Sequence, residues 1–429
     1  MENHPKEKAD QDQSLISAYY DGQTEREWDR TQRHRTEFAL TWRALEEHLP
    51  PLPARLLDCG GGPGRYAIQL SKLGYQVTLF DLSAGNLKVA RERAQQAGVE
   101  FYGLEQGSAI DLSRFPESAF DAVLLMGPLY HLLEEEDRLK ALQEARRVLR
   151  PGGTLFAAFI SRFAAHRREA KHNPQILLED WETSQTILET GRIDAKHSDG
   201  AEFIAYLAHP NEIAPLIWQA GFEVQAVLGL EGLAWERWVE VNWQVASDHS
   251  LLGGQEHLLV VAQRPVWRMV LAAIAQKLEE QNISYTAVGG VSVAAQGAPI
   301  PVKDIDLELS EKDAIRFGEI FAEAELEPVT FKESQNYRSH FGRFQIDSLI
   351  VEVMGDLQRR EKDGWKPSMT STREQVLVEG VPVSVSWLEE ETLAYLRRGR
   401  LDRAALCLPG CNPDRIRQLI TGEVKTNVI

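Results

Sequence analysis

Short apolar runs alternate with amphipathic stretches in the first part of the chain. Residues 55–58 and 77–80 read as strands, with apolar residues at 56, 57, 77, 79 and 80, and residues 65–72 between them carry a helical pattern. Strands that are buried on both faces of a parallel sheet read as continuous apolar runs, and each is joined to the next by a helix. The pattern therefore predicts an α/β domain that is built on a doubly wound parallel sheet.

The same domain is predicted to extend well beyond these strands. Residues 15–48 look helical, residues 211–221 form a helix that leads into a strand at 222–228, and residues 257–262 form a final strand. Residues 161–202 are polar and irregular, with helical stretches. Insertions at such a place are expected to carry substrate-binding elements.

A second domain begins after Arg264 and Pro265. Residues 267–281 form an amphipathic helix, because apolar residues recur on one helical face. Residues 285–288 and 304–309 read as strands. The predicted organisation is a disordered tail at 1–14, a first domain at 15–265 with an insert at about 161–205, and a smaller α+β domain at 266–429.

Length, charge and cysteine content mainly exclude certain classes of protein and partner. At 429 residues the chain is too long for one ordinary core, so two domains are expected. The net charge of −17 opposes binding to nucleic acid backbones and to anionic membranes. The three cysteines predict no disulfide framework, and neither a signal peptide nor a membrane-spanning run is recognisable. We therefore expect a cytoplasmic protein with a small-molecule partner, no nucleic acid and no membrane.

A glycine-rich turn after the first strand is the first candidate binding site. Gly60, Gly62 and Gly64 follow Asp58, and they leave no side chain to block a ligand. The next helix begins directly after this turn, so its free amides face the ligand. Asp81 ends the second strand, at the sheet edge where such folds bind ligands. Its carboxylate suits the two hydroxyls of a ribose.

The glycines alone also fit a dinucleotide site. Residues 62–67 match the loose G-x-G-x-x-A pattern. Asp58 opposes this interpretation, because a carboxylate beside the turn would repel a pyrophosphate. The same carboxylate would attract a ligand that carries an ammonium and a sulfonium, and S-adenosylmethionine (SAM) is such a ligand.

Further blocks follow the glycine turn in order, namely a strand at 120–125, the segment 127–132, a helix at 138–149 and the turn 150–155. Together they resemble the class I SAM-dependent methyltransferases. The resemblance implies a Rossmann-like fold and SAM as cofactor, although many relatives have Asp where this chain has Ser108. It assigns cofactor contacts to Asp58, Gly60, Gly62, Gly64, Asp81, Leu82, Ser108, Ala109 and Met126.

Methyl transfer needs a general base only when the acceptor arrives protonated. His131, which follows Tyr130 after the fourth strand, is the candidate base, with Tyr130 beside it in the site; alternatively, His131 packs against the cofactor or caps a helix. Aromatic residues of the N-terminal helices, such as Tyr19 and Tyr20, either form a lid over the cofactor or pack on the sheet. The chain lacks the motifs of DNA amino-methyltransferases and cytosine C5-methyltransferases, so a small-molecule acceptor is expected.

A second group of acidic residues lies in the second domain. Asp304 and Asp306 are two apart in a strand and therefore share a face, whereas their apolar neighbours point into the core. Two adjacent carboxylates repel each other unless a cation lies between them, which suits Mg²⁺ with triphosphate oxygens. Glu352 places a third acid inside an apolar strand.

With Gly289 and Gly290 after an earlier strand, these acids resemble the nucleotidyltransferases of the DNA polymerase beta superfamily over residues 266–429. The resemblance implies that the glycines hold nucleotide phosphates, that the three acids bind metal and act in catalysis, and that ATP is used with Mg²⁺. Relatives often carry Arg before the first Asp, whereas this chain has Lys303 there. A degenerate binding or scaffold domain is therefore an open alternative.

The sequence thus predicts SAM-dependent methyl transfer to a small-molecule acceptor, with a fused domain that transfers a nucleotidyl group from ATP. One alternative is a methyltransferase whose second domain only binds or scaffolds. Another is a binding protein that responds to SAM and nucleotides, and a third is a nucleotidyltransferase that modifies a protein or a nucleic acid.

Overall fold

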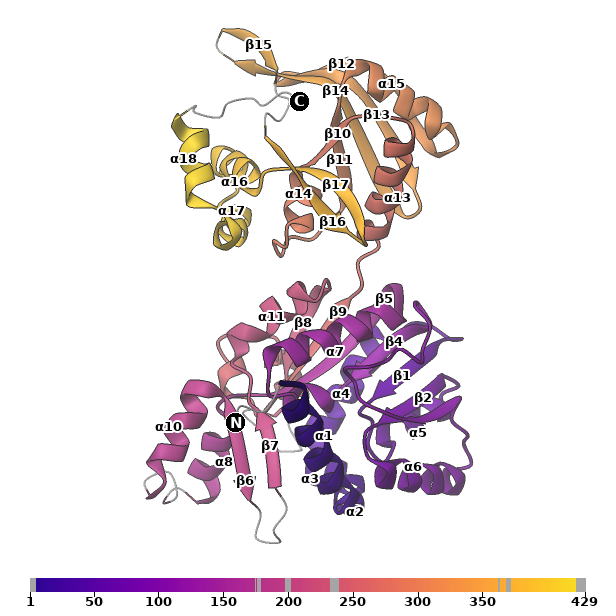
Figure 1. The fold of residues 1–429 in the computed structure, drawn as a ribbon, viewed down its shortest axis with the longest axis vertical. Coiled ribbons are helices and arrows are strands. Elements are labelled where there is room, and N and C mark those ends of the chain that lie inside the picture. The colour runs from indigo at the N-terminus through magenta and orange to yellow at the C-terminus, as the bar shows by residue number, and fades with distance from the viewer. Residues whose placement is uncertain are drawn as a thin grey trace. The chain divides into compact units, whose positions relative to one another are not determined.

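In the computed structural model, the chain divides into two compact units, residues 1–264 and residues 265–429. Each unit has its own sheet and its own hydrophobic core (Figure 1). None of the described helices has the length and apolar character to cross a bilayer. The structure describes residues 5–173, 175, 179–196, 202–231, 239–361, 363–367 and 372–421.

The first unit is built on a seven-stranded sheet. Its strands are β1 (Arg55–Cys59), β2 (Gln76–Asp81), β3 (Gly103–Gln106), β4 (Phe120–Leu125), β5 (Leu149–Ile160), β8 (Glu223–Gly229) and β9 (His257–Gln263). The strand order is β3-β2-β1-β4-β5-β9-β8, and β9 runs antiparallel to both of its neighbours. Chain connectivity reverses between β1 and β4, so their carboxyl ends border the crevice in which doubly wound sheets bind ligands. The predicted α/β architecture is confirmed.

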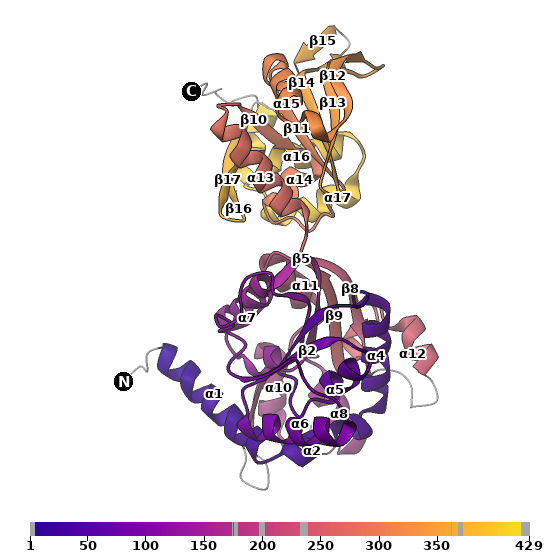
Figure 2. The ribbon, with the colours of Figure 1, turned by 90° about the vertical axis from the view of Figure 1, so that its right-hand side faces the viewer.

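Helices cover both faces of this sheet (Figures 1 and 2). They are α1 (Pro5–Asp21), α2 (Thr24–Trp28), α3 (Arg30–Arg33), α4 (Arg35–His48), α5 (Arg65–Lys72), α6 (Ala84–Ala97), η1 (Pro128–His131), α7 (Glu135–Val148), α11 (Pro210–Gln219), α12 (Val239–Val245) and η3 (Leu252–Gly254). In β4, Ala122 and Leu124 pack against α4, α5 and α6, whereas Val123 and Leu125 pack against α7 and α11. Because both faces of the strand are covered, it is apolar apart from Asp121, as the sequence pattern predicts.

Two segments of this unit differ from the prediction. Residues 1–14 are predicted as a tail, but α1 begins at Pro5. Proline suits the first helical position, and the Lys, Glu, Ala and Gln residues that follow favour a helix. The insert contains α8 (Ala164–His172) and α10 (Trp181–Thr190), and also a hairpin of β6 (Arg192–Lys196) and β7 (Glu202–Tyr206) that the sequence reading missed.

The second unit is an α+β fold whose core lies between a mixed sheet and its helices. Its strands are β10 (Tyr285–Val288), β11 (Asp304–Leu309), β12 (Glu325–Glu333), β13 (Tyr337–Ile346), β14 (Leu349–Glu361), β15 (Gly364–Pro367), β16 (Arg373–Val378) and β17 (Val381–Ser386). Its helices are α13 (Trp267–Glu280), α14 (Gly289–Ala295), α15 (Glu311–Ile320), η4 (Ala322–Ala324), α16 (Leu388–Arg397), α17 (Leu401–Cys407), η5 (Leu408–Gly410) and α18 (Pro413–Thr421).

The central strands of this sheet follow the order β14-β11-β10-β17. Strand β11 is parallel to β14 and antiparallel to β10. Ile305 and Leu307, which alternate with Asp304 and Asp306 along β11, are fully buried, as this alternation predicts. The acids therefore lie on the opposite face of the strand from the core.

Candidate functional site

A cavity lies at the carboxyl ends of β1, β2 and β4 in the first unit. The glycine turn, the end of β2, the loop after β3 and the segment from Met126 to Leu132 form its walls, and α1 contributes Ile16 and Tyr20. The predicted cofactor residues that line it are Asp58, Gly60, Gly62, Asp81, Leu82, Ser108, Ala109 and Met126. The predicted catalytic residues Tyr130 and His131 line it as well. Residues from widely separated segments are therefore brought together as the sequence predicts.

Backbone geometry explains the glycines of this turn. Gly60 and Gly62 have φ of 75° and 56°, which favours glycine. A Cβ on Gly60 would lie 2.4 Å from Pro128, so a side chain cannot be placed there. Gly64 does not line the cavity, so its cofactor contact stays a prediction. It is instead the N-cap of α5 with φ of 80°, and it packs closely against Phe101.

Asp58 is the most unusual residue of the cavity. Its side chain is 2% exposed, and Oδ2 has no hydrogen-bond partner among the described residues. Burial, reinforced by the nearby carboxylate of Asp81, raises the pKa of Asp58 to about 7. A buried carboxylate oxygen without a hydrogen-bond partner is costly. The site therefore favours a ligand that brings a positive charge to Asp58.

Asp81 is held in place by the surrounding backbone. Its Oδ2 accepts a hydrogen bond from the Gly62 amide at 2.8 Å, and Oδ1 accepts one from the Ser83 amide at 2.9 Å. Burial raises the pKa of Asp81, although these hydrogen bonds oppose the shift. A carboxylate oxygen accepts more than one hydrogen bond, so Asp81 can still receive hydroxyl donors from a ligand.

His131 is bonded at both ring nitrogens. Its Nδ1 lies 2.9 Å from the carbonyl of Ile204 and must donate, so Nε2 accepts the hydroxyl of Tyr20 at 2.6 Å. Burial lowers the pKa of His131 to about 4 and keeps the ring neutral at pH 7. This geometry favours a role in positioning Tyr20 over a role as a free base.

The N-terminal helices close one side of the cavity. Asp21, at the end of α1, accepts hydrogen bonds from the Ser83 hydroxyl at 2.5 Å and from the Gly85 amide at 2.9 Å. Tyr20 reaches into the cavity, whereas Tyr19 packs against Phe203 of the insert. Of the two open alternatives, Tyr20 therefore behaves as part of a lid and Tyr19 as a packing residue.

A second cavity adjoins the first. It lies between the N-terminal helices and the insert, and Tyr20, Glu27, Arg30 and Tyr130 line both cavities. Burial raises the pKa of Glu27. Sequence reasoning missed Glu27 and Arg30, because nothing in a polar helical segment shows which side chains will face a cavity.

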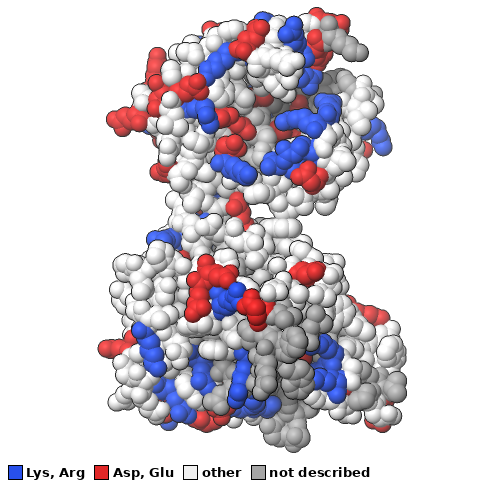
Figure 3. All heavy atoms as spheres, turned by 180° about the vertical axis from the view of Figure 1, so that it is seen from behind, with Lys and Arg blue, Asp and Glu red and all other residues white. Residues whose placement is uncertain are grey.

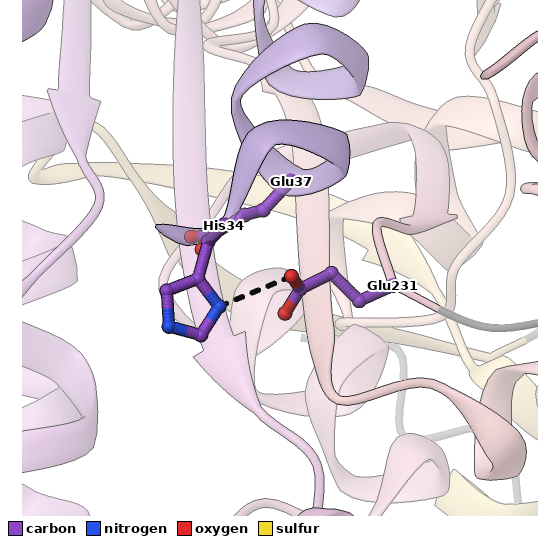
Figure 4. A group of neighbouring side chains, drawn as sticks. All are labelled: His34, Glu37 and Glu231. Carbon is purple, nitrogen blue, oxygen red and sulfur yellow. Dashed lines mark hydrogen bonds and ion pairs between the residues drawn. The ribbon is translucent and has the colours of Figure 1, made fainter. Parts of the chain in front are cut away.

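A buried cluster of ionisable side chains borders the second cavity. Glu231 accepts a hydrogen bond from His34 Nδ1 at 3.1 Å (Figure 4). It accepts a second one from His257 Nδ1 at 2.9 Å. Arg30 Nη2 donates to Glu37 Oε1 at 3.0 Å and lies 3.2 Å from His257 Nε2. Because Nδ1 of His257 donates to Glu231, its Nε2 accepts from Arg30.

The same cluster contains ligand types that suit a divalent metal. The ligand atoms of His34, Glu37 and Glu231 lie within 4.8 Å of one another. Arg30 already places a cation against Glu37, however, and both imidazoles are bonded to Glu231. The cluster therefore fits a closed ion-pair network better than a metal centre.

The acids of the second unit converge at one edge of its sheet. In the strand register Asp306 lies opposite Glu352 of β14 and opposite Val288 of β10, directly before Gly289. A Cβ on Gly289, whose φ is 67°, would lie 3.0 Å from Asp306 Oδ2. Burial, followed by the neighbouring carboxylates of Asp304 and Glu352, raises the pKa of Asp306 to about 7. This acidic group suits a hard cation such as Mg²⁺.

Charged residues from other elements of the second unit lie near these acids and near the glycine turn. Glu352 pairs with Arg343 of β13 at 3.0 Å. A Cβ on Gly290 would lie 3.8 Å from Arg403 of α17, so this arginine stands beside the glycine turn. Glu391 of α16 accepts a hydrogen bond from the Gly289 amide at 2.9 Å. Neither Arg403 nor Glu391 was found by sequence reasoning, because only the fold returns the last helices to this turn.

Comparison with known proteins agrees with the two predicted domain types. Residues 57–157 match the family described as methyltransferase domain, and residues 270–406 match the family described as aminoglycoside-2''-adenylyltransferase. The chain carries a methyltransferase domain followed by a nucleotidyltransferase-like domain. The first match contains the glycine turn and Asp81, and the second contains Asp304, Asp306 and Glu352.

Individual curated relatives that match part of this chain are named as methyltransferases. A ubiquinone biosynthesis O-methyltransferase of Xanthomonas axonopodis pv. citri is 35% identical over 121 residues, which are 28% of this chain and 49% of that protein. A tRNA 5-carboxymethoxyuridine methyltransferase of Escherichia coli K12 is 35% identical over 127 residues, or 28% of this chain and 47% of that protein. The chain thus spans about half the length of the curated relatives it matches.

Solved structures resemble each domain separately. A SAM-dependent methyltransferase of Methanosarcina mazei is 22% identical, with a TM-score of 0.40, and the match covers 52% of this chain and 97% of that one. A protein of Thermotoga maritima that was assigned as a nucleotidyltransferase is 31% identical, with a TM-score of 0.31, over 37% of this chain and 95% of that one.

Proposed function

We propose that the methyltransferase domain transfers a methyl group from SAM to a small-molecule acceptor. The observation that carries the proposal is the buried Asp58, whose Oδ2 lacks a partner among the described residues beside an open glycine turn. Asp58 would hold the ammonium of SAM, and Asp81 would hold the ribose hydroxyls. Ser108 and Ala109 would border the adenine.

When bound, SAM supplies an electrophilic methyl group, and its sulfur takes the electron pair of the broken bond. The remaining work of the chain is alignment and exclusion of water. Tyr20, held by His131, closes the cavity from α1. Glu27 lies where the two cavities meet, and its raised pKa suits it to take the proton of an acceptor hydroxyl or amine.

Titration calorimetry with SAM tests the cofactor assignment. Asp58→Asn should weaken SAM binding ~10- to 100-fold, because a hydrogen bond to a charged group contributes about 1.5–3 kcal/mol. Asp248→Asn removes a carboxylate on the surface, away from the cavity, and should bind SAM as the wild type does. Equal affinities of wild type and Asp58→Asn would overturn the assignment.

We further propose that the nucleotidyltransferase-like domain binds ATP with Mg²⁺. The support is the strand register that aligns Asp306 with Glu352 beside Gly289. Asp304, Asp306 and Glu352 would hold the metal, and Arg403 would meet the phosphates near Gly290. Bound Mg²⁺ would neutralise phosphate charge during nucleotidyl transfer.

ATP titration in the presence of Mg²⁺ tests this second site. Binding to the wild type that is lost in Asp304→Ala/Asp306→Ala supports a nucleotide site, and transfer of labelled AMP would then be sought. Absence of binding at millimolar ATP would instead support a degenerate scaffold domain, leaving methyl transfer as the single activity.

A further inference from the structure

The second cavity of the methyltransferase domain has a distinctive lining. Ile193, Phe203 and Leu207 from the insert give it an apolar wall, and Tyr19 faces them from α1. At its junction with the cofactor cavity stand the side chains that line both cavities, including Glu27. An acceptor in this cavity would therefore have one end beside the cofactor.

Basic side chains dominate the rest of the lining, although the chain as a whole has a net charge of −17. Among the described residues, four arginines and two glutamates line the cavity. On the face drawn in Figure 3, Lys and Arg side chains likewise gather over the lower part of this domain. The charged lining residues are Arg26, Arg30, Arg33, Arg168, Glu27 and Glu256.

These arginines are available to a ligand to different degrees. Arg30 uses Nη2 for its contacts to Glu37 and His257, so within the described residues its Nε and Nη1 are left for another acceptor. The Arg168 side chain is 62% exposed and pairs through Nε with Glu169 at 3.3 Å. Arg33 is also exposed, and its Nη2 donates to the backbone carbonyl of Arg26 at 2.9 Å. Arg33 and Arg168 line only the second cavity, which separates their effect from any contact to the cofactor.

We propose that this cavity is the acceptor site and that it takes an organic anion. The apolar body of the acceptor packs against Phe203 and its neighbours, a carboxylate or phosphate group binds Arg33 and Arg168, and the methylated atom lies beside Glu27. Guanidinium groups recognise both kinds of oxyanion through paired hydrogen bonds. The proposal rests on the methyl-transfer function proposed above and names its substrate class.

Matched probes test the charge requirement directly. The full-length protein is first titrated with S-adenosylhomocysteine, which tests the cofactor site by itself. The saturated complex is then titrated separately with two anions, 4-hydroxybenzoate and phenyl phosphate, and with the neutral 4-hydroxybenzamide. Saturation-transfer NMR follows the binding of each compound. The variants are Arg33→Gln/Arg168→Gln and the control Arg91→Gln, which removes an exposed arginine of α6 that lines neither cavity.

We expect at least one anion to bind ~10-fold more tightly than the amide, a difference of about 1.4 kcal/mol. The double variant should lose this preference while its affinity for S-adenosylhomocysteine stays unchanged, and Arg91→Gln should keep both. Equal binding of anions and amide, a preference that survives in the double variant, or no anion binding to the saturated complex would each overturn the proposal. Failure of S-adenosylhomocysteine itself to bind would instead overturn the cofactor assignment.

Discussion

At the scale of single residues, the two domains share one device, a carboxylate whose ionised form is disfavoured by burial and by neighbouring carboxylates. Asp58 is almost fully buried beside Asp81, and Asp306 is crowded by Asp304 and Glu352. In both places burial and like charges raise the pKa to about 7. A positively charged ligand reverses this effect, since it favours the ionised form. Ligand binding should therefore depend on pH near neutrality in both domains.

For Asp58, the direction in which SAM affinity changes with pH follows from the protonation of its carboxyl group. Below pH about 7 the carboxyl is protonated in the free protein, so SAM must displace a proton to pair its ammonium with the carboxylate. SAM affinity should fall ~10-fold per pH unit below this value, because one pKa unit is about 1.4 kcal/mol. Calorimetry at pH 8 and pH 5.5 measures the fall. An equally steep fall in Asp58→Asn would assign the titration to another group.

For Asp306 the same argument applies to the metal. Mg²⁺-dependent ATP binding should weaken as the pH falls from 8 to 6, because protons compete with the metal for the Asp306 carboxylate. Asp306→Asn should bind weakly at both values. ATP titrations in excess Mg²⁺ provide the comparison, and an affinity of the wild type that does not change between these pH values would contradict the account.

The role of a residue can be predicted from the sequence when its side-chain type and its neighbours along the chain are enough to place it. Asp58 and Asp81 follow strand-forming runs, so their place at the sheet edge could be predicted. Gly64 belongs to the same glycine pattern, but its positive φ and its packing are explained by its place as the N-cap of α5. Glu27 could not be predicted at all, because its position depends on how α2 meets the insert.

At the scale of elements, the N-terminal helices are fixed to the sheet by ionic contacts as well as by apolar packing. His34, at the N-terminus of α4, bonds to Glu231 after β8, which also bonds to His257 of β9. The bond to Glu231 raises the pKa of His34, although burial opposes the shift. Burial raises the pKa of Glu231, but hydrogen bonds from His257 and His34 outweigh it and hold the pKa well below its usual range.

The pH range in which this contact stabilises the fold follows from the raised pKa of His34 and the lowered pKa of Glu231. The contribution of His34 is fully present below its unfolded pKa of about 6.5, and it is lost as the pH rises through the higher folded value. The contribution of Glu231 is present above its unfolded pKa of about 4.3, and it is lost as the pH falls toward the depressed folded value. Between these limits the contact is strongest.

Thermal unfolding of His34→Gln tests this contact. The variant should unfold at a lower temperature than the wild type at pH 6, and the difference should shrink as the pH rises to 9. His249→Gln, which removes an exposed histidine, should show no such trend. A difference for His34→Gln that stays constant across this range would mean that the contact does not depend on the charge of His34.

Elements with strong local patterns were predicted well, and elements that depend on distant partners were not. Helix α5 and strand β4 match their predicted bounds, because an amphipathic period or an apolar run defines each one. The β6–β7 hairpin was missed, since its strands lie in a polar insert and gain their partner only on folding.

At the scale of the whole molecule, the chain joins two units that each have a complete core and a separate candidate site. Asp58→Asn should therefore weaken SAM binding without changing the affinity for ATP, and Asp304→Ala/Asp306→Ala should have the opposite selectivity. Paired titrations of both variants with both ligands measure this independence. A change of more than ~3-fold at the other site would show coupling between the domains.

Two domains could be expected from the length of the chain and from the new series of helix and strand patterns that begins after Pro265. The pairing of their activities could not, because no residue pattern connects an acceptor for methyl transfer with an acceptor for nucleotidyl transfer. The lining of the second cavity could not be predicted either, because α2, α3 and the insert form it together only in the folded chain.

The central claim is that Asp58 and Asp81 define a SAM site in the methyltransferase domain. The most direct measurement is a crystal structure of the full-length protein with S-adenosylhomocysteine. The account predicts the amino group at Asp58 Oδ2 and the ribose hydroxyls at Asp81. A ligand bound elsewhere, or one bound in this cavity without contact to either carboxylate, would contradict it.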